Sequence, residues 1–118
     1  MSRRLERVGE ELRSEIARLV RAEVADPRVA LVTILRVDVS PDLRNALVFW
    51  SHIARPGGPD TDAVAAGLAS AAPFLRRRLA HALPLKRMPA LAFRHDAALE
   101  EGDRTLALLK EIADESAR

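Results

Sequence analysis

The sequence of 118 residues contains no cysteine or tyrosine, and only four aromatic side chains. Without cysteine the chain cannot form disulfides, thiolate zinc sites or a cysteine nucleophile, and this composition suits a reducing compartment. No apolar run approaches the roughly 20 residues that a membrane-spanning helix needs. The first residues show no apolar signal segment, so we expect the protein to be cytoplasmic.

The remaining composition is that of a folded chain, because 48% of the residues are hydrophobic and the formal net charge is only +2. A chain of this length can bury a real core but is too short for two ordinary domains. We therefore expect a single domain over residues 1–118, with a core spanning about residues 5–112, and a monomer in solution.

The positive charge is unevenly distributed along the chain. Residues 1–62 hold ten basic and ten acidic side chains, whereas residues 63–95 hold six basic side chains and no Asp or Glu. Such uncompensated charge is typical of a surface that binds polyanions. We predict RNA or DNA contact for five residues of this segment, namely Arg76, Arg77, Arg78, Lys86 and Arg87.

A second basic group occurs near the N-terminus, at Arg3, Arg4 and Arg7. Acidic residues stand close to it in the sequence, so a solvated helix face explains it as well as a binding site does. Both basic groups are carried forward as candidate RNA-binding residues.

Apolar spacing predicts an α+β fold. Helical periodicity covers residues 3–24, 61–83 and 99–113, and β-branched or aliphatic runs at 30–39, 45–53 and 91–95 predict three strands. Three strands with helices on one face form a small α+β sandwich, in the order helix-strand-strand-kinked helix-strand-helix.

Two local irregularities modify this pattern. The first strand alternates imperfectly, and a bulge near Leu35 and Arg36 would place its aliphatic side chains on one face. Proline has no backbone N–H and clashes with the preceding turn, so the second helix should form two pieces that meet at Ala71, Ala72 and Pro73.

The sequence provides little for catalysis. His95 and Asp96 are neighbours on a predicted strand and would point to opposite faces. The three histidines have no metal-ligand spacing, and the glycines match no phosphate-binding loop. We therefore predict no enzyme activity, no metal and no cofactor. The main alternative is a protein-interaction module that docks a partner or itself through Leu47 and Phe49 on the open sheet face.

Several segments resemble one known family. Residues 24–28 (VADPR), 32–34 (VTI) and 37–43 (VDVSPDL) are similar to the N-terminal half of the ribosome-binding factor A family, and residues 74–79 (FLRRRL) and 88–93 (MPALAF) to its later motifs. The resemblance covers about residues 5–112. It implies a type II KH-like fold in which an interrupted helix replaces the usual glycine-clamp loop, with the interruption here at Ala71, Ala72 and Pro73.

The resemblance also implies a function. It indicates a ribosome assembly factor that binds the free small (30S) ribosomal subunit and its 16S ribosomal RNA, assists late maturation and processing, and leaves before translation. It implies no cofactor and no catalysis.

Overall fold

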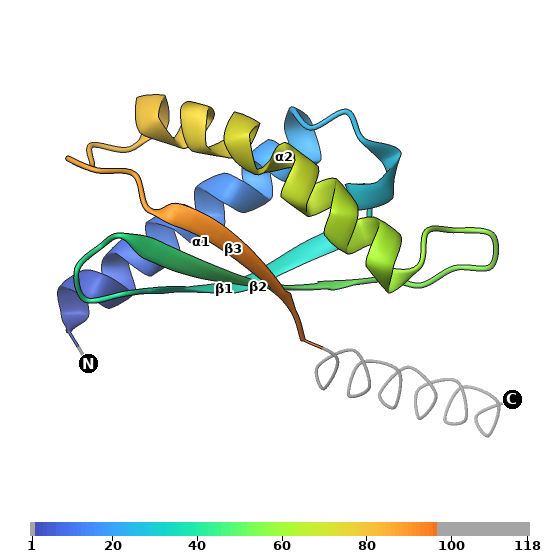
Figure 1. The fold of residues 1–118 in the computed structure, drawn as a ribbon, viewed down its shortest axis with the longest axis horizontal. Coiled ribbons are helices and arrows are strands. Elements are labelled where there is room, and N and C mark those ends of the chain that lie inside the picture. Colours follow the sequence, from blue (N-terminus) through green and yellow to red (C-terminus); the bar gives the residue numbers. More distant parts are fainter. Residues whose placement is uncertain (1, 97–118) are drawn as a thin grey trace, which may run out of the picture.

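The computed structural model describes residues 2–96, with six elements in chain order (Figure 1). They are α1 (Arg3–Ala22), the 3-10 helix η1 (Pro27–Val29), β1 (Val32–Val39), β2 (Asn45–His52), α2 (Thr61–Ala82) and β3 (Ala90–His95). The helix predicted over residues 99–113 lies outside the described residues. No helix within residues 2–96 is long and apolar enough to cross a bilayer.

The three strands form one sheet in the order β1-β2-β3. A tight turn joins β1 to β2 as an antiparallel pair, and the chain then crosses through α2 so that β3 runs parallel to β2. The helix α1 packs on β1, and α2 packs on β3 and on α1, so both helices cover the same face (Figure 1). This arrangement confirms the predicted α+β architecture with helices on one side of the sheet.

The predicted bulge in β1 is confirmed. The pairing with β2 shifts between Ile34 and Arg36, which leaves Leu35 as the extra residue. Ile34 and Val37 are consequently both buried, although they stand in opposite phases of the sequence. One inserted residue therefore brings both halves of β1 onto the core face.

The side chains of Ala46, Val48 and Trp50 on β2 point into the core. The other face of β2 carries Leu47 and Phe49, and both are half-buried. The Arg36 guanidinium lies 4.1 Å from the centre of the Phe49 ring. A cation over this ring covers part of the apolar surface that the interaction-module alternative requires.

The second helix is continuous over Thr61–Ala82 with Pro73 inside it, so it does not divide into two separate helices, and the kink at Ala71, Ala72 and Pro73 stays a prediction. Pro73 removes the N–H that would bond to the carbonyl of Ala69, and neither residue is buried, so this carbonyl lies on the side of the helix that water reaches. Leu68 and Leu75, on either side of the proline, are fully buried. Their packing keeps both halves of α2 on the same core.

The first helix approaches β1 closely at Gly9. A Cβ at this position would lie 2.5 Å from the carbonyl oxygen of Val37, a distance that real Cβ atoms essentially never show. The absence of a side chain lets the first turns of α1 lie directly against the strand. This contact places the start of α1 next to the β1–β2 turn.

Candidate nucleic-acid interface

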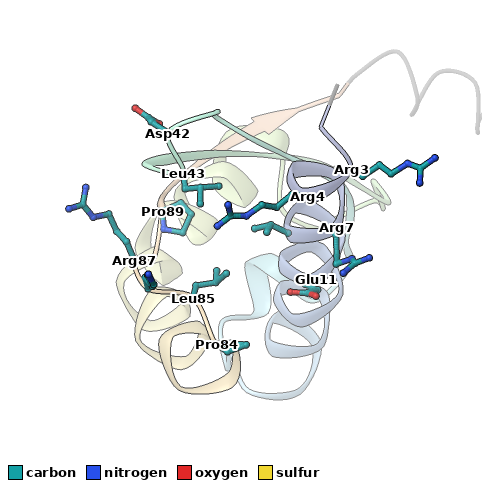
Figure 2. A pocket seen from close by; sticks show the side chains of 12 residues that line it. Arg3, Arg4, Arg7, Glu11, Asp42, Leu43, Pro84, Leu85, Arg87 and Pro89 are labelled. Carbon is teal, nitrogen blue, oxygen red and sulfur yellow. The ribbon is translucent and has the colours of Figure 1, made fainter.

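A cleft of about 670 Å³ opens between the first turns of α1, the β1–β2 turn and the connector from α2 to β3 (Figure 2). Five cationic side chains line it, namely Arg3, Arg4, Arg7, Lys86 and Arg87. Only two acidic residues, Glu11 and Asp42, share the lining. The fold thus brings the N-terminal basic group into one cleft with Lys86 and Arg87, two members of the second basic group.

The floor of the cleft is apolar, formed by Val8, Leu43, Pro84, Leu85 and Pro89. Figure 2 shows the Arg4 side chain reaching across this floor, whereas the side chains of Arg3 and Arg87 point outward from opposite rims. The cations could be identified from the sequence, whereas the floor could not, because its residues come from three distant segments.

The β1–β2 turn is held by a small hydrogen-bond network. The Ser40 hydroxyl donates to the Asp42 carboxylate at 2.6 Å, and the Arg44 backbone N–H donates to the same oxygen at 3.0 Å. These hydrogen bonds hold the pKa of Asp42 below its ordinary value, and the bond from Ser40 makes the largest contribution. Figure 2 shows the Asp42 side chain pointing away from the cleft, so its negative charge opposes an anion there only weakly.

Two hydrogen bonds hold the connector where it enters β3. The Arg76 guanidinium donates to the Met88 carbonyl with a separation of 3.3 Å between Nη2 and oxygen. The Ala90 backbone N–H donates to the Arg44 carbonyl at 2.9 Å, which ties the start of β3 to the β1–β2 turn. Arg76 therefore positions the segment that carries Lys86 and Arg87, and it retains its own positive charge.

Arg78 has a partner that the sequence does not reveal. Its guanidinium forms an ion pair with Glu23, 55 residues earlier, and the same carboxylate lies 3.4 Å from Arg18. The premise that the charge of Arg78 is uncompensated is therefore wrong. Because this side chain already has a partner within the fold, we leave Arg78 out of the candidate site.

The cleft cations lack the carboxylate partners that several other arginines of the fold have. Arg13 and Arg28 lie 2.5 Å and 2.7 Å from the carboxylates of Glu10 and Asp26, and the hydrogen bonds from these arginines lower the pKa of both acids. Across residues 2–96, no carboxylate forms an ion pair with Arg77 or with any of the five cleft cations. Guanidinium and ammonium groups that have no carboxylate partner are available to bind phosphate oxygens.

The histidine considered for catalysis lies in an aromatic cluster. The rings of His95 and Trp50 have centroids 4.7 Å apart, and the His52 ring lies 5.9 Å from each of them. Within the described part of the chain, no three His, Cys, Asp or Glu residues come together as metal ligands would. Trp50 is buried in the core.

The antiparallel β1–β2 pair, the crossover through α2 and the parallel third strand define a type II KH-like domain, here with a basic cleft at one end. The chain belongs to the ribosome-binding factor A family: the family model described as "Ribosome-binding factor A" matches residues 4–109. This confirms the resemblance found in the sequence motifs.

Individual relatives agree with this assignment. The chain is 41% identical to ribosome-binding factor A of Alkalilimnicola ehrlichii, over 95% of this chain and 85% of the relative. It is 40% identical to that of a Synechococcus strain, over 94% and 77% of the two chains.

Solved structures show the same fold. The crystal structure of ribosome-binding factor A from Thermus thermophilus superposes with a TM-score of 0.69 at 23% identity, covering 77% of this chain and 94% of that one. A homology model of the Thermus thermophilus factor, fitted into a cryo-EM map of a 30S complex, gives a TM-score of 0.64 at 24% identity. The match covers 79% of this chain and 96% of that one.

Proposed function

We propose that this protein binds the free small ribosomal subunit through the cleft, contacts its 16S ribosomal RNA there, and assists late maturation and processing. Family membership and the 30S complex of the Thermus relative support the choice of partner. The single observation that carries the site is that five cations, each without an ion pair among residues 2–96, line one cleft.

The residues divide by role within this proposal. Arg4, Lys86 and Arg87 bind phosphates, with Arg3 and Arg7 extending the contact along the rim. Arg77 lies on the exposed side of α2 and does not line the cleft, so it adds a separate contact to RNA that lies against that helix. Phosphate contacts position a protein on RNA and supply most of the salt-dependent affinity.

The protein acts by binding rather than by catalysis, and it works in the cytoplasm, where it meets immature subunits. The cleft presents cations, aliphatic side chains and two carboxylates, and no serine, threonine or histidine stands among its lining residues. Such a surface supplies affinity for a polyanion.

The test is a titration of binding to free small subunits at several salt concentrations. If about three to five phosphates are engaged, the slope of log affinity against log salt should be about −2 to −4, taking about −0.7 to −0.9 per contact. Absence of binding, or binding that does not depend on salt, would overturn the proposal.

A further inference from the structure

The cleft has more apolar surface than phosphate binding explains. A phosphate needs cations and N–H donors, whereas the floor between the basic rims is built from Leu43, Leu85 and Pro89 together with Val8 and Pro84. The volume of about 670 Å³ lies in the range of sites that enclose small organic groups. A ligand complementary to the whole cleft therefore combines a flat apolar part with flanking negative charge.

Leu43 provides a second, independent observation. Its φ is +61°, a left-handed conformation that a residue with a Cβ rarely adopts and that Gly or Asn adopts at lower cost. The Ser40 carbonyl accepts the Leu43 N–H at 2.9 Å, so Leu43 closes the turn at the position where glycine is usual. Its half-buried side chain points into the cleft toward Leu85 (Figure 2). The turn itself gives no reason for a leucine here, whereas an apolar ligand does.

We propose that the cleft takes one unstacked nucleotide of RNA, with its base against the floor at Leu43, Leu85 and Pro89. This inference rests on the proposed function and deepens it. The phosphates on either side of that nucleotide bind Arg4 on one wall and Lys86 and Arg87 on the other. Unpaired segments of RNA offer such bases, which proteins commonly bind through their faces.

The position of Arg4 favours a base over an acidic peptide. Its guanidinium extends across the floor, where its face can stack on the base while its in-plane N–H groups donate to the neighbouring phosphate (Figure 2). The cleft lining also carries three more cations than carboxylates, which suits a negatively charged ligand.

Two footprints on free small subunits test the inference. Hydroxyl radicals report protection of the RNA backbone, and a base-methylating reagent reports protection of unpaired bases. With the wild-type protein we expect at least one protected base between protected backbone positions. Leu43→Asn suits the positive φ and removes the apolar contact, so it should abolish the base protection, retain the backbone protection and weaken binding about tenfold. Leu43→Gly should behave in the same way.

Ile53→Asn is the matched control, because Ile53 is 65% exposed and does not line the cleft. It should leave both footprints unchanged. The inference is overturned if no base is protected, if Leu43→Asn leaves base protection intact, or if Ile53→Asn abolishes it equally. Weaker subunit binding by Leu43→Asn without any change in base reactivity would also overturn it, and would indicate a protein segment in the cleft. Absence of backbone protection by the wild type would instead contradict the proposed function.

Discussion

Three cations from both walls of the cleft allow a quantitative test of the electrostatic account. Arg4, Lys86 and Arg87 are exposed, and none forms an ion pair among the described residues, so alanine at all three should leave the fold intact. Losing three phosphate contacts should make the slope of log affinity against log salt shallower by about 2. Binding to free small subunits should weaken about a hundredfold at about 0.1 M salt, and the loss should nearly vanish at about 1 M.

The matched control removes the same total charge elsewhere. Arg13, Arg18 and Arg28 are each held by a carboxylate, so their triple replacement by alanine should leave the salt slope nearly unchanged. Both triple variants are titrated against free small subunits labelled for fluorescence anisotropy. Equal losses of slope and affinity would show that binding follows net charge and would refute the assignment to the cleft.

Four further substitutions test other parts of the account. Glu11→Gln removes a carboxylate from the cleft and should tighten subunit binding a few-fold, and weaker binding would contradict its placement. Arg78→Ala breaks a partly exposed ion pair, so it should lower the free energy of unfolding by no more than about 1 kcal/mol and leave subunit binding nearly unchanged in the same titration. Pro73→Ala restores a helical N–H on the side of α2 that water reaches and should raise the free energy of unfolding in urea by about 1–3 kcal/mol, whereas a loss would reveal packing by the proline ring. Gly9→Ala should lower the free energy of unfolding by about 1–3 kcal/mol in the same urea assay, because the added methyl group meets the carbonyl of Val37. An unchanged free energy of unfolding would show that α1 can shift away from the strand.

The local features of the fold were predictable because short-range chemistry determines them. The bulge at Leu35 follows from a break in the alternation of one strand, and the element boundaries follow from apolar spacing that the core enforces. The continuity of α2 through Pro73 was not predictable in this way. It depends on buried leucines before and after the proline and on a carbonyl that water reaches, and these are properties of the packed molecule.

The site was predictable only in part. Charge counting located Lys86 and Arg87, but it could not show that the start of α1 lies opposite them, because this pairing depends on how two helices share one sheet. It also could not reveal Glu23 as the partner of Arg78, since the two residues are 55 positions apart. One signal for the floor was present in the sequence, because Leu43 follows a Pro-Asp pair at the turn position where glycine is usual.

The distribution of the protein among ribosomal particles tests the central claim most directly. A lysate that contains the tagged protein is separated on a density gradient, and each fraction is assayed for the protein. We expect the protein to sediment with free small subunits and to be absent from translating ribosomes. When Arg4, Lys86 and Arg87 are replaced by alanine, the protein should no longer be found in the small-subunit fractions. Equal amounts on translating ribosomes, or a small-subunit fraction that the triple variant retains in full, would contradict the central claim.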